Sequence, residues 1–270
     1  DCICPYCGHK GDHSQFYTQD QIDYAMSVAK NYMVSELQKV FKNAFKPKHS
    51  SRKGLISIEF KVKTGRLPPI QFYQEAKLET QVECKHCTLK YAVFGVYAYC
   101  PDCGIHNSQQ ILEKNLELAQ KELDLAATVD AELAEYLTND ALENVISAFD
   151  GFGREICRTY ADKTASPAQS ADIRFQNLTG AQNNLQKHFG FDIAGSLSPS
   201  EWSAAIRGFQ KRHLLAHNSG VIDDDYIAKS NDATAIKGHK IAIISSEVTD
   251  LIVIVRTMGA HIISEMSKLP

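Results

Sequence analysis

The sequence contains no long uninterrupted hydrophobic run. Its longest apolar stretch, residues 241–255, is broken by Ser245, Glu247 and Asp250, and no basic segment followed by an apolar run opens the chain. A membrane-spanning helix needs about 20 mainly apolar residues, and a secretory leader needs a basic and then an apolar region. We therefore expect a soluble, uncleaved protein that has no membrane partner.

The sequence also lacks the loops that bind nucleotide phosphates. It has no glycine-rich phosphate loop, no lysine-containing P-loop and no nucleophile elbow, and this removes the common nucleotide-dependent classes. Internal repeats and low-complexity tracts are absent as well. What remains is a chain of 270 residues, 44% hydrophobic and 23% charged, which is enough for one or two globular domains with real cores. The formal net charge of -3 excludes few classes of function or partner.

Cysteine is unevenly distributed along the chain. Six of the eight cysteines form three Cys-x-x-Cys pairs, and all six precede residue 104, whereas the later part contains only Cys157. The pairs are Cys4/Cys7, Cys84/Cys87 and Cys100/Cys103. Such pairing is typical of a metal site in a reducing compartment rather than of a disulfide scaffold, so we expect a cytoplasmic protein. Cys157 lies in an apolar helical pattern, where a free cysteine behaves as a small hydrophobic residue.

The second and third pairs have the spacing of a structural zinc site. Twelve residues separate Cys84/Cys87 from Cys100/Cys103, which lets two tight loops close a tetrahedral site from opposite ends of a hairpin. Four thiolates leave no open position for an activated water, so a structural Zn²⁺ is expected. Glycine follows the second cysteine at Gly104 and Gly8, where a positive backbone angle is often needed.

The first pair, Cys4/Cys7, is also predicted to bind metal, but its remaining ligands are open. Cys2, His9, His13, a distant histidine or another subunit would have to complete this site. In a rival arrangement, Cys4/Cys7 shares a metal with one of the two later cysteine pairs, and the other later pair is left with an incomplete ligand set. The three pairs resemble the broad zinc-ribbon class over residues 1–106. That resemblance implies a module whose metal stabilises the fold or which serves as a binding platform.

The cysteine distribution and the apolar periodicity divide the chain near Ser108. We expect a small α+β zinc-ribbon-like module over residues 1–108, with an inserted helix over residues 22–45 and a strand over residues 55–62. Residues 109–270 are predicted to form a helical bundle, which makes the fold class mainly α.

The helical spacing within the second domain predicts five regions of helix. Two core-facing stripes run through residues 112–137 and 142–160, and three further helices are expected over residues 175–189, 200–217 and 247–266. Gly190 ends the first of these three, and Ser198-Pro199-Ser200-Glu201 opens the second.

Basic residues are concentrated between the first two cysteine pairs. Residues 39–53 contain six lysines and arginines and no acid: Lys39, Lys42, Lys46, Lys48, Arg52 and Lys53. Next to a zinc module, this stretch is a candidate phosphate-binding surface. A solvated helix end and linker would give the same pattern.

Residues 207–220 carry the most informative pattern, because three cations and two histidines crowd one helix end. Arg212 is followed five residues later by His217, with the polar His213 directly after the arginine. This arrangement resembles the signature of the HEPN superfamily, small helical bundles of which many are ribonucleases in toxin–antitoxin and antiphage systems. The resemblance covers residues 111–270 in architecture and a few residues in motif.

These residue types suit cleavage of RNA without a metal. Such cleavage needs a base near the 2′-hydroxyl, an acid at the leaving oxygen and a fixed cation on the phosphorane. Histidine transfers protons near neutrality, and arginine presents a permanently charged fork to phosphate oxygens. His217 is therefore the predicted proton-transfer residue, Arg212 the phosphate clamp and His213 an auxiliary residue. The resemblance implies that two subunits bring their motifs together in a homodimer.

Several alternatives to this motif assignment stay open. Arg207 and His213 also satisfy the looser family spacing, and His213 and His217 share one helix face and could bind a metal. Both histidines could instead cap the helix end or belong to a buried polar network.

Two acidic positions in the second domain are predicted to have structural roles. Consecutive aspartates at 223–225 are expected to open a helix rather than to bind metal. Asp150 and Arg154 are expected to form a surface ion pair, although they could line the cleft of His217.

Two functions follow from the sequence. The first is a metal-independent endoribonuclease with RNA as substrate, held in check by an antitoxin or regulatory protein. The second is a non-catalytic RNA- or protein-binding module of the same fold, in which the arginine and histidines only bind phosphate.

Overall fold

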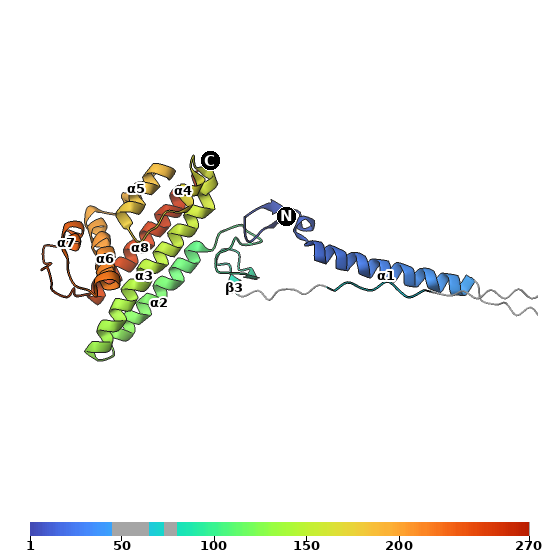
Figure 1. Cartoon of the computed structure of the whole chain (residues 1–270), viewed down its shortest axis with the longest axis horizontal. Coiled ribbons are helices and arrows are strands. Elements are labelled where there is room, and N and C mark those ends of the chain that lie inside the picture. Colours follow the sequence, from blue (N-terminus) through green and yellow to red (C-terminus); the bar gives the residue numbers. More distant parts are fainter. Residues whose placement is uncertain (45–64, 73–79, 270) are drawn as a thin grey trace, which may run out of the picture.

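The computed structural model describes residues 1–44, 65–72 and 80–269. Over these residues the chain is mainly helical, with two small antiparallel sheets near the N-terminus (Figure 1). The α-helices are α1 (Gln19–Ala44), α2 (Ser108–Ala126), α3 (Ala131–Tyr160), α4 (Pro167–Ala171), α5 (Leu178–Phe189), α6 (Pro199–Asn218), α7 (Asp224–Ser230) and α8 (Ser245–Met266). The strands are β1 (Cys2–Ile3), β2 (Lys10–Gly11), β3 (Thr80–Glu83) and β4 (Lys90–Val93). Short 3-10 helices cover His13–Phe16, Ala161–Lys163 and Ile193–Ser196.

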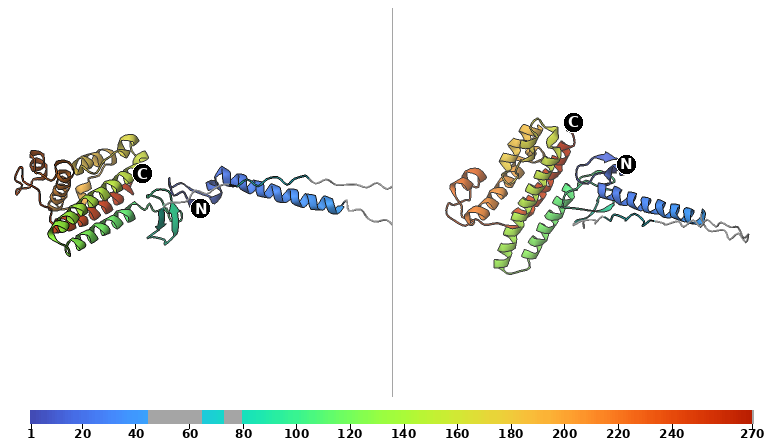
Figure 2. Two further views of the ribbon diagram at one scale, coloured as in Figure 1. Left: turned by 60° about the horizontal axis from the view of Figure 1, so that its bottom comes forward. Right: turned by 45° about the vertical axis from the view of Figure 1, so that its right-hand side comes forward.

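Helices α2, α3, α5, α6 and α8 form one bundle around a shared hydrophobic core, and α7 packs on α6 over a smaller core of Leu214, Ile222 and Tyr226. Helices α2, α3 and α8 lie side by side, and α6 packs against α3 and α8 (Figures 1 and 2). Phe149 of α3 is fully buried and contacts Phe175 and Phe209 with its ring edge-on. Close packing is possible at Gly153, where a β-carbon would lie 2.5 Å from the ring of Phe175. The predicted helical fold of this part is confirmed.

The helix ends follow the capping residues seen in the sequence. Ser198 and Glu201 form a capping box at the start of α6. The side chain of Ser198 accepts a hydrogen bond from the backbone N–H of Glu201, and the side chain of Glu201 accepts one from the backbone N–H of Ser198. Gly190 ends α5 in the left-handed conformation, with φ of 81°. Asp223 accepts a hydrogen bond from the backbone N–H of Tyr226, which confirms that the three aspartates open a helix, α7.

Helix α5 begins later than predicted, at Leu178 instead of near residue 175. The reason is a local cap: Asn177 is extended, and its Oδ1 accepts a hydrogen bond from the backbone N–H of Gly180. Before this cap, the backbone N–H of Phe175 donates a 2.7 Å hydrogen bond to the buried Asp150 of α3. The predicted ion pair of Asp150 with Arg154 is present at 3.8 Å. It is not a surface pair, however, because Asp150 is only 5% exposed.

The first predicted apolar stripe ends earlier than expected. Helix α2 stops at Ala126, and Asp130 caps the start of α3 through the N–H of Leu133. Leu133 and Leu137, which the helical spacing had joined to the α2 stripe, therefore belong to α3. Leu133 is exposed.

The cysteine-containing module lies between α1 and the bundle (Figure 1). Strands β3 and β4 pair antiparallel, and β1 pairs with β2. The first hairpin docks on the second: the N–H of Ile3 donates to Pro101, and the N–H of Tyr99 donates to Pro5. Asn107 closes the module directly before α2 by exchanging hydrogen bonds with Ala98.

Helix α1 confirms the helix predicted over residues 22–45 as far as Ala44, and extends away from the module (Figure 2). Residues 65–72 run alongside it, because Asn31 donates to the carbonyl of Pro68 and Gln38 to that of Gly65. The predicted strand over residues 55–62 and the basic side chains of Lys46, Lys48, Arg52 and Lys53 lie outside the described residues. None of the helices in the described ranges has the length and apolar character that a bilayer crossing requires.

Candidate functional site

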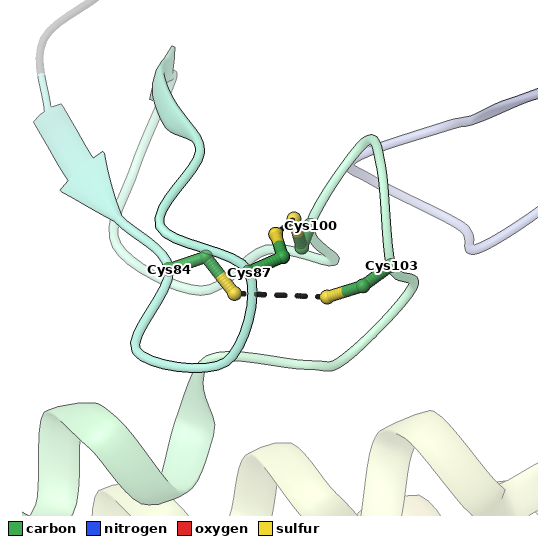
Figure 3. A group of neighbouring side chains, drawn as sticks. All are labelled: Cys84, Cys87, Cys100 and Cys103. Atoms are coloured by element: carbon green, nitrogen blue, oxygen red, sulfur yellow. Dashed lines mark hydrogen bonds between the residues drawn. The ribbon is translucent and has the colours of Figure 1, made fainter.

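The structure brings four of the predicted metal ligands together. The sulfur atoms of Cys84, Cys87, Cys100 and Cys103 all lie within 4.8 Å of one another (Figure 3). Cys84 Sγ is 3.6 Å from Cys103 Sγ, and Cys87 Sγ is 3.5 Å from Cys100 Sγ. A disulfide would require about 2.05 Å. Around a tetrahedral ion with metal–sulfur bonds of about 2.3 Å, the sulfurs would be about 3.8 Å apart, so this group could hold a metal ion.

Two loops of the same backbone design carry these thiols. In the first, the N–H of Cys84 donates to Leu89 and the N–H of Thr88 donates to Cys84. The second repeats this pattern with Cys100, Ile105 and Gly104. Gly104 has φ of 74° as expected, whereas the corresponding position of the first loop is Thr88, with φ of 64°.

The environment of Cys84 favours its thiolate form. Its burial opposes ionisation, but the backbone N–H groups of Cys87 and His86 donate to the sulfur, and together with the neighbouring thiols they lower the pKa of Cys84 to about 7. Despite the backbone N–H groups of Leu89 and Ile105, burial and the neighbouring thiols raise the pKa of Cys87 to about 12 and also raise that of Cys103, so one thiolate of the group forms first. A metal is bound by the thiolate and not by the thiol.

The pair Cys4/Cys7 lies outside this group. Its loop has the same backbone pattern, because the N–H of Cys4 donates to His9 and the N–H of Gly8 donates to Cys4. Among the described residues, the four later cysteines alone form a group of three or more metal-ligating side chains. The metal prediction for Cys4 and Cys7 therefore stays a prediction without completing ligands. Cys157 is buried, and burial raises the pKa of its thiol to about 12.

The predicted catalytic residues lie in the last turns of α6. His213 and His217 are exposed, and their ring centroids are 4.7 Å apart. Arg212 is partly buried, and its Nη1 approaches Gln176 Oε1 at 3.5 Å. Within the described part of the chain, the Nε of Arg212 is buried and makes no hydrogen bond. One helix end thus presents two accessible imidazoles, and next to His213 in the sequence lies a partly buried guanidinium whose Nη1 approaches Gln176.

A hollow of 560 Å³ opens beside His213, between α6 and the first turns of α5. Its lining residues are Gln176, Asn177, Thr179, Gly180, Asn183, Gln210, His213 and Lys229. Amide side chains dominate this lining, and no acidic side chain belongs to it. The amides come from different segments and follow no sequence motif, so the sequence alone did not identify them.

Asp225 of α7 is the acidic neighbour of this helix end. Its pKa is lowered mainly by the hydrogen bond from Lys229, at 2.6 Å, and by the positive charge of the same ammonium group. Asp224 likewise pairs with Lys237. The aspartates at 223–225 thus have partners within the chain.

Arg207, the alternative motif arginine, faces another part of the bundle. It lines a hollow of 190 Å³ between α6 and α8, together with Lys211 and Glu247. His213 does not line that hollow. The structure thus separates Arg207 from the hollow of His213 and brings Arg212, through Gln176, to its edge.

Comparison with protein-family models, with curated proteins and with solved structures finds no match for this chain. The functional interpretation therefore depends on the residues of the site.

Proposed function

We propose that this chain is a metal-independent endoribonuclease of the HEPN type, acting in toxin–antitoxin or antiphage defence. The observation that supports it most is the exposed pair His213 and His217 at the end of a bundle helix, with Arg212 directly before His213 and with His213 lining a hollow without acids. RNA is a polyanion, and a surface that combines cations and neutral hydrogen-bonding groups suits it.

The reaction uses the substrate's own 2′-hydroxyl. Its oxygen attacks the adjacent phosphorus and loses its proton to a base, while the bond from phosphorus to the 5′-oxygen breaks and that oxygen receives a proton from an acid. His217 transfers a proton, Arg212 holds the phosphate oxygens as their charge grows, and His213 assists in positioning. The products are a 2′,3′-cyclic phosphate and a 5′-hydroxyl.

One Arg212/His217 pair supplies too few groups for the acid, the base and the charge stabilisation together. A homodimer that joins the helical halves would bring a second pair to each composite site. An antitoxin or regulatory protein would restrain the activity at rest. RNA and a second copy are therefore the expected partners.

We further propose that the four-cysteine group holds a structural zinc ion. The sulfur separations and the closed set of four thiolates fit Zn²⁺. When bound, the ion supplies folding free energy to a small module with few buried apolar residues, and no reaction step passes through it.

The proposed activity is tested by brief incubation of the pure chain with total RNA in buffer containing EDTA. Wild-type protein should degrade the RNA, and His217→Ala should be slower by about 10² to 10⁴-fold, the usual contribution of proton transfer. His13→Ala removes another exposed histidine, in the cysteine-containing module outside the bundle, and is the matched control.

Each other outcome has a defined meaning. RNA that is bound but remains intact with every variant would favour the non-catalytic binding module. Cleavage that requires Mg²⁺ would favour a metal bound by His213 and His217.

A further inference from the structure

A second hollow lies next to the hollow beside His213, at the N-terminus of α5. The second hollow has a volume of 550 Å³ and shares Asn177 and Gly180 with the first. Each volume lies within the range of about 300–1,000 Å³ that is usual for ligand sites. We infer that the two hollows form a track for single-stranded RNA, which leads from His213 across α5. This inference rests on the proposed function and adds the substrate class.

Two faces of α5 build the track. Thr179 and Asn183, one helical turn apart, line the first hollow. Gly180, Asn184 and Lys187 follow the same spacing and line the second. A strand of RNA that lies across this helix would therefore meet amides first and a cation next.

The first hollow has the chemistry of base recognition. Asn183 and Gln210 each present both a donor and an acceptor, which is what the edges of bases require. Gln176 also approaches Arg212 at 3.5 Å. A phosphate held by Arg212 would thus bring its neighbouring nucleotide to these amides.

The second hollow has the chemistry of phosphate binding. Lys187, His188 and Arg174 line it, and its one acid, Asp172, already pairs with Arg174 at 2.8 Å. Lys187 is exposed. The backbone N–H groups in the first turn of α5 add the positive end of the helix dipole where the two hollows meet.

The amides favour a single strand over a duplex. They line a hollow, and they can reach the hydrogen-bonding edges of bases only where those bases are unpaired. Duplex RNA is recognised chiefly through its shape, its 2′-hydroxyls and its phosphates. An acidic protein partner would need the cations but not the amides.

The track is tested by equilibrium binding to the full chain carrying His217→Ala, in which cleavage is expected to be too slow to consume the RNA during the measurement. The probes are a fluorescein-labelled 12-nucleotide RNA, the same RNA in a duplex, and a labelled poly-glutamate peptide. We expect the single strand to bind most tightly. A tighter duplex or a tighter peptide would overturn the inference.

Two pairs of variants locate the binding. Asn183→Asp places a negative charge in the first hollow and should weaken single-strand binding about fivefold, which corresponds to a repulsion of about 1 kcal/mol. Gln186→Glu adds the same charge to the same helix outside both hollows and should have less than about half that effect. Lys187→Ala should lower the salt slope by about 0.7, whereas Lys121→Ala on α2 should leave it unchanged.

The inference and the proposed function fail in different ways. If wild-type protein cleaves RNA but Asn183→Asp and Gln186→Glu weaken binding equally, the track is wrong and the nuclease stands. If RNA binds with the expected variant pattern but is never cut, the track stands and the nuclease is wrong. Circular dichroism of each variant checks that it is folded.

Discussion

Lys211 Nζ donates a 2.6 Å hydrogen bond to Glu247 Oε2 and a 3.0 Å hydrogen bond to the carbonyl oxygen of Ala242. These contacts join α6 to the first turn of α8 and the segment before it, and the ammonium group is almost fully buried. Lys211 directly precedes Arg212. The ion pair therefore fixes the turn of α6 that carries the proposed phosphate clamp.

Breaking this ion pair from one side should destabilise the bundle. Glu247→Ala leaves the buried ammonium with the Ala242 carbonyl as its described partner and should lower the free energy of unfolding by about 1–3 kcal/mol. The double variant Lys211→Met/Glu247→Ala removes the unpaired charge and should be more stable than Glu247→Ala alone. Urea denaturation of the variants measures both differences. Equal stabilities of single and double variants would contradict this role.

Loss of a thiolate from the four-cysteine group should release the metal and unfold the module. Cys84→Ser and Cys100→Ser should each lose the one zinc expected for this site, because structural zinc sites depend on a complete ligand set. The bundle has its own core and should retain its helical signal. Mass spectrometry of bound metal and thermal melts are the measurements. Lys85→Ala, an exposed residue of the same loop that carries no thiol, is the control, and Cys84→Ser with unchanged zinc content would disprove the ligand set.

A composite site predicts complementation between inactive subunits. Arg212→Ala and His217→Ala should each form homodimers with little activity. When they are mixed and allowed to exchange subunits, a heterodimer regains one arginine and one histidine in a shared site, so part of the cleavage rate should return. Sedimentation measures the dimer, and a labelled RNA measures the rate. A monomeric chain that cleaves RNA would rule out the shared site.

The attack by the 2′-hydroxyl predicts the chemistry of both the substrate and the products. A single 2′-deoxy sugar at the scissile position of a short RNA should abolish cutting there, because the nucleophile is missing. Cutting at the normal rate would eliminate the mechanism. Arg212→Lys keeps the charge but loses the two-pronged donor geometry and should also slow cleavage.

The sequence predicted those parts of the fold that depend on local signals. The start of α6 was visible in Ser198 and Glu201, and the end of α5 in Gly190, because capping is a property of neighbouring residues. The start of α5 was missed, although it has a local cap in Asn177, whose side chain accepts the N–H of Gly180. What the sequence does not show is the contact of Phe175 with Asp150, 25 residues earlier, because no local pattern announces it.

The candidate sites were predictable to different degrees for the same reason. The four thiols have a fixed spacing that any zinc-binding hairpin must satisfy. The sequence could therefore assign Cys84 and Cys103 to one metal site in advance. The amides Gln176, Asn183 and Gln210 carry no spacing rule and converge only in the folded bundle. They become functional candidates only because Arg212 and His213 lie beside them.

The docking of the first hairpin makes the chain between Pro5 and Tyr99 a closed loop, since the two residues are joined by a backbone hydrogen bond. The entropy lost on closing a loop grows only with the logarithm of its length, so a twofold change in length alters the cost by about 0.6 kcal/mol. The segment from α1 to β3 therefore has little thermodynamic constraint on its length. Chains with the same cysteine hairpins could have a much shorter or a much longer segment between α1 and β3. They could still form the hydrogen bond between Pro5 and Tyr99.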